Sequence, residues 1–330
     1  MLRYIAKRIL QFIPVFLGVT MLLFLISNFM PGVDPVQIRV GERAVDPVLR
    51  EALEREFGLD QPWYIQYKNY MVTLLQGDLG TSMSTGRSVN DIIADKFPNT
   101  IRLALVAIVF QIIMGIGAGI ISAIKRKSFL DMVVTLSTSM MVSLPVFWIG
   151  LILQYVFGIW MREVTGGTFF MPISGMTGTT PAMFGANADW LFFIMPAFTL
   201  ACVFTAYTAR IMRSQLLEVK NMDFVRTAKA KGLSNARILW GHKMKFALIP
   251  VITAIGMDFG SMLAGALLTE TVFNWPGIGR ELMLAVLRRD FQVVIGITTM
   301  ILFVVMIINL VVDLLYGLLD PRIRIGGAEE

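Results

Sequence analysis

The sequence predicts an all-α integral membrane protein, because it is rich in hydrophobic residues, is poor in charged residues and contains long apolar runs. Of the 330 residues, 56% are hydrophobic and 16% are charged, whereas about a quarter of the residues in an ordinary soluble domain are charged. Several apolar runs reach the ~20 residues that a helix needs to cross a bilayer. The single cysteine, Cys202, lies in one of these runs, so no disulfide within the chain is possible.

Six apolar runs are expected to form transmembrane helices. The first is too long for the core of a cleaved signal peptide, and Met30-Pro31-Gly32 does not resemble a cleavage site, so this run should remain as a helix. The six predicted spans are Ile9–Met30, Thr100–Ile124, Met132–Trp160, Trp190–Ala209, Phe246–Thr269 and Phe291–Leu319.

These spans divide the chain into four parts. Residues 1–30 form a cytoplasmic N-terminus and the first transmembrane helix, and residues 31–99 form a large external loop. Residues 100–319 form a core of five transmembrane helices that includes a polar loop at 210–245, and residues 320–330 form a cytoplasmic tail.

The external loop should contain two amphipathic helices. Asp46-Pro47 supplies an N-cap and a first helical residue, and Gly58 suits the end of that helix. Pro62–Gln76 carries several aromatic side chains and is followed by Gly77, a second stop signal. Aromatic residues beside a span are typical of the membrane surface, so packing against the outer ends of the spans is favoured over direct contact with a substrate.

The distribution of charge predicts the orientation of the chain. More than half of the 29 Lys and Arg residues fall in the segments 1–8, 125–131, 210–245 and 320–330. Basic loops remain on the cytoplasmic side, so both termini and the 210–245 loop should be cytoplasmic. The net charge of +6 is then explained without a nucleic-acid partner.

The 210–245 loop contains a stretch that is too polar for lipid. Gly232 suits a helix C-terminus, and either Ser234 or Asn235 suits the N-cap of a following helix. Small residues at Ala228, Ala230 and Gly232 should leave a surface with little side chain, surrounded by basic residues. This pattern indicates a helical bend offered to a cytosolic partner; an ordinary basic loop is the alternative.

The stretch resembles the cytoplasmic coupling loop of ABC importer permeases, and in particular the B-type subunits of the dipeptide and oligopeptide (peptide/nickel) branch. The general family pattern is Glu-Ala-Ala, three residues, Gly, nine residues, and Ile-x-Leu-Pro. This chain keeps Ala228 and Gly232. It has Arg226 and Thr227 where the general pattern has Glu and Ala, and His242 where the pattern has Ile. These departures resemble the variant of the pattern that is seen in the dipeptide and oligopeptide branch. The segments Gly77–Ser82, Glu270–Gly279 and Asp320-Pro321-Arg322 are also similar to this family.

The resemblance implies a permease subunit of an ATP-driven importer for dipeptides or oligopeptides, located in the inner (cell) membrane of a bacterium or archaeon. It implies a second, C-type permease subunit, two cytosolic ABC ATPases that use ATP and Mg²⁺, and an extracytoplasmic peptide-binding protein. It also implies that the residues that couple the chain to the ATPase are Asp223, Arg226, Thr227, Ala228, Lys229, Ala230, Lys231, Gly232 and Leu233.

The residues offer little for catalysis. The single histidine, His242, cannot form a histidine metal cluster, and no Gly-x-x-x-x-Gly-Lys-Ser/Thr loop is present. We therefore expect no catalytic residues, no metal site and no cofactor bound by this chain, which should not itself hydrolyse ATP.

Asp258 is the notable charge within a predicted span, because a carboxylate there costs roughly 2.5–3.5 kcal/mol on insertion scales. Helical spacing places it on one face with Ser261 and Met262. One hypothesis is that this face lines a translocation path, where Asp258 favours the ammonium end of a peptide. A structural hydrogen bond, or a pair with a neighbouring subunit, is the alternative.

Other functions remain open at this point. Nickel, glutathione or another small solute would suit the same class of importer. A secondary transporter driven by protons or sodium would use intramembrane charges, for which Asp258 alone is slender support, and a membrane-embedded enzyme lacks a plausible site.

Overall fold

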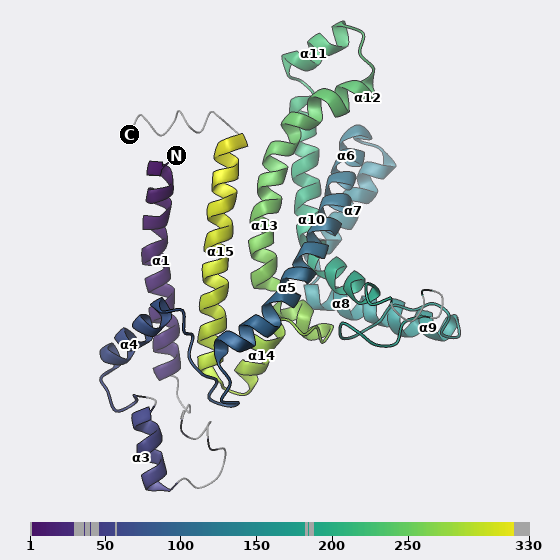
Figure 1. Cartoon of the computed structure of the whole chain (residues 1–330). Helices are drawn as coiled ribbons and strands as arrows, with labels where there is room; N and C mark the ends of the chain where they lie inside the picture. Colours follow the sequence, from purple (N-terminus) through teal and green to yellow (C-terminus); the bar gives the residue numbers. More distant parts are fainter. Residues whose placement is uncertain are drawn as a thin grey trace. The chain divides into compact units, whose positions relative to one another are not determined.

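The computed structural model of the chain is built from helices (Figure 1). It describes residues 2–29, 36, 40, 46–56, 58–181, 184 and 188–319. Over these ranges no strand is present, and the β-type pairing is limited to an isolated bridge between Thr81 and Ser88. The predicted all-α class is confirmed. The predicted tail at 320–330 and the segment Met30-Pro31-Gly32 lie outside the described residues.

The chain forms two compact units, which are described separately. The first unit contains the described residues up to Asn99 together with Gly277–Met306. The second contains Thr100–Pro276 together with the described residues from Ile307 onward. Two long helices, α5 (Val89–Gln111) and α15 (Phe291–Leu319), contribute residues to both units.

The first unit has a small apolar core, formed where α5 and α15 begin. Its remaining helices are α1 (Leu2–Phe29), α3 (Pro47–Glu56), α4 (Trp63–Leu75) and α14 (Ile278–Leu287). The core is made by the buried side chains of Val89, Ile92, Ile278, Ala285, Val293 and Ile297.

The two predicted external helices are present with the predicted ends. Asp46 accepts a hydrogen bond from the backbone of Val48 at 3.0 Å, as an N-cap does. Gly58 and Gly77 follow α3 and α4 with φ values of 65° and 81°, a backbone region that glycine adopts without strain. Because these stops depend on local backbone chemistry, the sequence located them well.

Aromatic residues of α4 pack against apolar helices, as expected. The Tyr67 ring lies 5.3 Å from the ring of Phe24 on α1, measured between centroids, and its hydroxyl contacts that of Thr20 at 3.2 Å. The Tyr70 hydroxyl lies 3.1 Å from the Thr299 hydroxyl on α15. Burial raises the pKa of Tyr70, although the bond with Thr299 opposes the change.

The second unit is organised around α10 (Leu191–Val219), in which 67% of the most apolar window is buried. In Figure 1, α10 runs beside α13, and α11 and α12 lie at one end of this pair. The other helices, in which π-helical segments carry the label η, are η1 (Ile112–Ile116), α6 (Gly117–Ile124), α7 (Phe129–Ser143), α8 (Val146–Leu153), η2 (Gln154–Trp160), α9 (Met161–Val164), α11 (Asp223–Ala230), α12 (Asn235–Ile238), η4 (Leu239–Lys243) and α13 (Met244–Val272).

Two glycines allow the second predicted span to approach α10 closely. A Cβ atom placed on Gly115 would lie 2.8 Å from Cβ of Thr208, and one on Gly119 would lie 2.6 Å from Cβ of Met212. Small residues permit such backbone contact between membrane helices, where packing rather than the hydrophobic effect drives association.

The third predicted span, Met132–Trp160, is not one helix. α7 ends at Ser143, Leu144 is extended (φ −88°, ψ 137°), and α8 begins after Pro145. A proline disfavours the helical conformation of the residue before it and lacks an N–H to continue the ladder, so this proline ends one helix and begins the next.

Five helical stretches are long and apolar enough to cross a membrane: Val89–Ile124, Val146–Val164, Leu191–Val219, Asn235–Val272 and Phe291–Leu315. Leu10–Ile26 and Phe129–Ser143 are shorter apolar helices. The helix of the fourth predicted span continues beyond the predicted span end at Ala209, because α10 runs to Val219. The protein is therefore a multi-pass membrane protein whose helices extend into the predicted 210–245 loop.

Candidate functional site

The centre of the predicted coupling loop at 210–245 is a helical bend formed by α11, a tight turn and α12. Gly232 has φ 75°, its N–H donates to the Lys229 carbonyl at 2.9 Å, and the Leu233 N–H donates to the Ala228 carbonyl at 3.2 Å. This pair of bonds is the Schellman motif. Ser234, rather than Asn235, caps α12 by accepting from the backbone of Arg237 at 3.3 Å. The predicted glycine stop is confirmed.

The inner face of the bend is a small apolar cluster. Buried side chains of Val219, Val225, Ala228 and Ile238 pack together, with Phe224 and Leu233 against them. Ala228 is only 5% exposed, so the expectation that it lies on the outward surface is wrong. An eight-residue helix hides the face that meets α10 and α12, and the sequence did not reveal which face this is.

The outer face of the bend carries exposed charges around small residues. A Cβ atom on Gly232 would meet nothing within 4 Å, and the Asp223–Arg226 ion pair at 3.4 Å is exposed. The exposed members of the predicted coupling set are Asp223, Arg226, Thr227, Lys229, Ala230, Lys231 and Gly232, while Leu233 is half-buried. A face of this kind can bind a complementary surface through charge and close approach.

The bend is joined firmly to the two long helices on either side. Val219, at the end of α10, belongs to the apolar cluster. Phe224 stacks on Phe246 of α13, with 4.7 Å between ring centroids and 29° between the planes. Force applied to α11 therefore has two direct packing contacts through which it reaches the apolar helices.

Asp258 lies in a polar contact that joins three helices. Its Oδ2 accepts from Nε2 of Gln111 at 2.6 Å, and the same amide donates to Oγ1 of Thr208 at 2.8 Å. Gln111 is fully buried, and its Oε1 has no partner among the described residues. Gln111 was not predicted as a site residue, although a lone amide in a long apolar run was an available signal.

The other two residues predicted to share a path with Asp258 are separated by the structure. Ser261 is exposed, whereas Met262 is fully buried at 0% exposure. Asp258 itself is half-buried. Only Asp258 and Ser261 of the predicted set are thus open to anything outside this chain.

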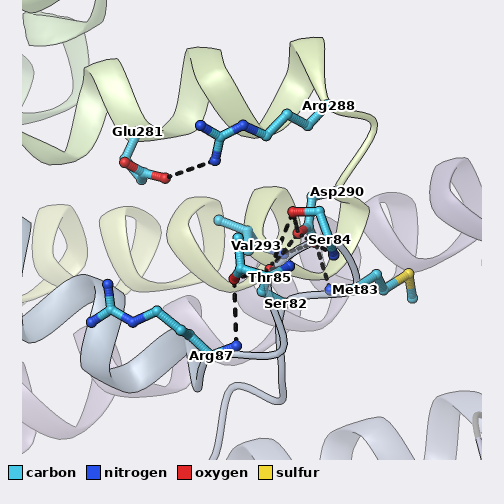
Figure 2. Close-up of polar contacts among 9 residues, drawn as sticks. All are labelled: Ser82, Met83, Ser84, Thr85, Arg87, Glu281, Arg288, Asp290 and Val293. Carbon is cyan, nitrogen blue, oxygen red and sulfur yellow. Dashed lines mark hydrogen bonds and ion pairs between the residues drawn. The ribbon is translucent and has the colours of Figure 1, made fainter. Parts of the chain in front are cut away.

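Another polar cluster holds the Gly77–Ser82 segment, which was predicted to be external, and the residues after it (Figure 2). Asp290, just before α15, accepts from the hydroxyls of Ser82 and Ser84 at 2.6 and 2.7 Å, and from the backbone of Met83 at 3.2 Å. Burial alone would raise the pKa of Asp290, but the bonds from Ser82 and Ser84 outweigh burial and hold that pKa below its ordinary value. This cluster fixes a loop.

The Glu270–Gly279 segment contains a buried contact within the second unit. Glu270 is fully buried and accepts from the Thr100 hydroxyl at 2.6 Å, and its carbonyl accepts from the backbone of Trp275 at 2.8 Å. The Trp275 ring meets Phe193 edge-on, 4.6 Å between centroids. Among the described residues, no group of three or more His, Cys, Asp or Glu side chains is placed to hold a metal ion.

Comparisons with known proteins agree with these features. A family model described as "Binding-protein-dependent transport system inner membrane component" matches residues 115–325, and the model for the N-terminal part of such components matches residues 1–104. The chain is 43% identical to a di/tripeptide transport system permease protein DppB of Pseudomonas aeruginosa, over 98% of this chain and 99% of the relative.

It is also 37% identical to a dipeptide transport system permease protein DppB and 36% identical to a glutathione transport system permease protein GsiC, both of Escherichia coli, over 98% of this chain and 99% of each relative. An inward-facing structure of the MetNI methionine ABC transporter is similar with a TM-score of 0.55 and 14% identity, over 69% of this chain and 96% of that chain. At that identity the likeness shows the fold alone. The extent of the family match shows that this chain belongs to the binding-protein-dependent transport system inner membrane components.

Proposed function

We propose that this chain is a membrane-spanning subunit of an ATP-driven importer of dipeptides or oligopeptides. The single observation that carries this proposal is the 43% identity to a di/tripeptide permease over 98% of the chain. The exposed, basic bend at α11 supports it, because an importer of this class needs a cytosolic surface on which its ATPase acts.

The chain would work as part of a larger complex. A second, C-type permease subunit completes the path, two cytosolic ABC ATPases supply the energy from ATP and Mg²⁺, and an extracytoplasmic binding protein delivers the peptide. This chain then contributes no catalytic residue, and its role is to form the path and to change conformation by alternating access.

We assign contact with the ATPase to the outer face of the bend, which comprises Asp223, Arg226, Thr227, Lys229, Ala230, Lys231 and Gly232. Ala228 and Leu233 support this face from within through the apolar cluster. Small residues at positions 230 and 232 permit close approach of the partner, and the basic side chains favour an acidic surface.

We further propose that Asp258 and Ser261 face the translocation path. The Gln111 amide orients the Asp258 carboxylate at 2.6 Å, and a half-buried carboxylate favours the ammonium end of a peptide. Asp258→Asn should lower dipeptide uptake and leave the assembly of the complex normal. Unchanged uptake by the assembled variant would count against a role for the charge.

The same proposal fixes the placement in the membrane. Six crossings, with Leu10–Ile26 as the first and the α7–α8 pair as the third, leave both termini and α11 in the cytosol of a bacterium or archaeon. The basic side chains around α11 agree with this orientation.

Glutathione is a second candidate cargo, because a glutathione permease is 36% identical to this chain over 98% of its length. Nickel and other small solutes remain within the same class. A secondary transporter would instead rely on Asp258, which here is bonded to a neutral amide of the same chain.

The test is uptake of a labelled dipeptide by the complete complex reconstituted in liposomes, with ATP enclosed with the ATPases. Gly232→Trp should leave the protein in the membrane and abolish ATP-dependent uptake, because the indole would occupy the surface that the ATPase approaches. Gly241→Trp, at an exposed glycine outside α11 with open space around it, is the matched control. Uptake that persists in Gly232→Trp, or that follows a proton gradient without ATP, would overturn the proposal.

A further inference from the structure

Asp131, near the start of α7, receives hydrogen bonds from three separate parts of the second unit. Arg213 of α10 donates to it twice, from Nε at 3.1 Å and from Nη2 at 3.0 Å. The hydroxyl of Ser122 on α6 and the backbone N–H of Lys127, at 2.9 Å, donate as well. One carboxylate thus joins α6, α7, α10 and the turn between α6 and α7.

Water screens this contact less than it screens a surface ion pair. The side chain of Asp131 is 10% exposed and that of Arg213 is 34% exposed, whereas exposed pairs contribute little because water screens them. Two parallel bonds from one guanidinium also fix the relative orientation of the two side chains. Lys127 has φ 63°, an uncommon conformation for a residue other than glycine, and its bond to Asp131 holds the turn in this conformation.

Arg213 lies on the helix that leads directly to the coupling bend. α10 continues without interruption from Arg213 to Val219, and Val219 packs with Val225 and Ala228 of α11. A continuous helix transmits displacement along its axis, since each turn is bonded to the next. Movement of α11 therefore reaches Arg213 through packed side chains and a single helix.

Next to Arg213, α6 and α10 are also in close backbone contact. A Cβ atom on Gly119 would lie 2.7 Å from the carbonyl oxygen of Ala209 and 2.6 Å from Cβ of Met212. Because Met212 precedes Arg213, the packing of α6 and the ion pair of α7 meet the same turn of α10. The α6–α7 turn has little freedom to move independently of α10.

We propose that the Asp131–Arg213 pair is a positioning element that transmits movement of the coupling bend to α6 and α7 during transport. The inference rests on the proposed function, since it requires a cytosolic ATPase that moves α11. Loss of the pair should allow ATP to be hydrolysed without the full rearrangement of α6 and α7.

The experiment measures the number of dipeptides transported for each ATP hydrolysed by the complete complex in liposomes. Asp131→Asn keeps the size of the side chain but removes its charge, and it should lower this ratio roughly 2- to 30-fold while ATP hydrolysis continues. Arg213→Lys keeps the charge but offers no two-bond fork, and its ratio should lie between those of Asp131→Asn and the wild type. Asp95→Asn, which breaks an exposed ion pair with Arg87, should leave the ratio unchanged.

A purely structural role gives a different result. The yield of the complex and its thermal stability would fall in Asp131→Asn, but the ratio measured on the assembled fraction would match the wild type, and this result overturns the inference. If Asp131→Asn does not assemble, Arg213→Lys decides, and a wild-type ratio in that variant also overturns it. Absence of ATP-dependent uptake by the wild type overturns the proposed function and this inference with it, whereas normal uptake with unaltered variants overturns the inference alone.

Discussion

Asp290 illustrates how a single buried charge can hold a loop in place. Its carboxylate accepts hydrogen bonds from Ser82 Oγ, Ser84 Oγ, Ser84 N at 3.0 Å and Met83 N. Bonds to a charged acceptor are stronger than bonds between neutral groups. Because these donors come from one short segment, the segment after Gly77 is fixed to the residue that precedes α15.

The lowered pKa of Asp290 predicts a dependence of stability on pH. Although burial raises it, the bonds from Ser82 and Ser84 bring the folded pKa below the ordinary value of 3.8, so the unfolded chain binds the proton more readily than the folded one. The contribution of Asp290 is therefore fully present above pH 3.8 and is lost as the pH falls through the folded pKa. Asp290→Asn should lower the free energy of unfolding by about 1–3 kcal/mol at neutral pH and weaken the pH dependence in acid.

Thermal unfolding of the purified protein in detergent, at neutral pH and between about pH 2 and pH 5, checks this prediction. Asp60→Asn, which also removes one carboxylate but at an exposed position of the same unit, is the control and should unfold at the wild-type temperature at neutral pH. Identical acid profiles for Asp290→Asn and the wild type would show that the carboxylate does not hold the loop.

At the scale of helices, packing against α10 depends on glycines of the second span that differ in their surroundings. A Cβ atom on Gly119 would lie 2.6 Å from Cβ of Met212 and 2.7 Å from the carbonyl oxygen of Ala209, whereas a Cβ atom on Gly117 would meet nothing within 4 Å. Gly119→Ala should destabilise the protein by roughly 1–3 kcal/mol through overpacking. Gly117→Ala should be neutral or slightly stabilising, because alanine favours the helix. Melting temperatures of the two variants in detergent check the contrast, and equal changes would contradict it.

The sequence predicted those helix ends that depend on local chemistry. The cap at Asp46, a cap at either Ser234 or Asn235 and the stop at Gly232 follow from side-chain acceptors and from a positive φ that glycine tolerates, and the structure selects Ser234. The inward orientation of Ala228 was not predicted, because it depends on contacts with Ile238 and with the end of α10 that form only in the folded chain.

The break in the third predicted span shows a related limit. Proline occurs inside intact helices at Pro14, Pro98, Pro196 and Pro250, yet at Pro145 the helix ends. Proline is tolerated in membrane helices when neighbouring groups satisfy the freed backbone. Its effect is therefore set by the surroundings, and the residue type alone did not distinguish the five positions.

Polar contacts between helices were likewise hidden in the sequence. Asp258 attracted notice as a charge in an apolar run, but its partner Gln111 is far from it along the chain. Asp131 was not selected at all, because a charge at the edge of a span is ordinary, and only the fold brings Arg213 to it. The existence of such residues is readable from the sequence, while their pairing is a property of the packed helices.

At the scale of the whole molecule, the proposed six crossings place α4 and α11 on opposite sides of the membrane, and the N-terminus on the side of α11. Cys202 is buried and is the sole cysteine of the sequence, so a Cys202→Ser background allows single reporter cysteines to be added. Suitable positions are Arg8, Lys68 and Lys231, of which Lys68 and Lys231 are exposed.

A maleimide that cannot cross the membrane should label Lys68→Cys in cells whose inner membrane is intact. It should label Arg8→Cys and Lys231→Cys only after that membrane is permeabilised, because the positive charge around both positions favours the cytosol. Labelling of Arg8→Cys together with Lys68→Cys would mean that the first helix does not cross and that five crossings remain. Labelling of Lys231→Cys from outside would place the coupling bend away from any cytosolic ATPase, and ATP-driven movement of α11 would then be physically impossible.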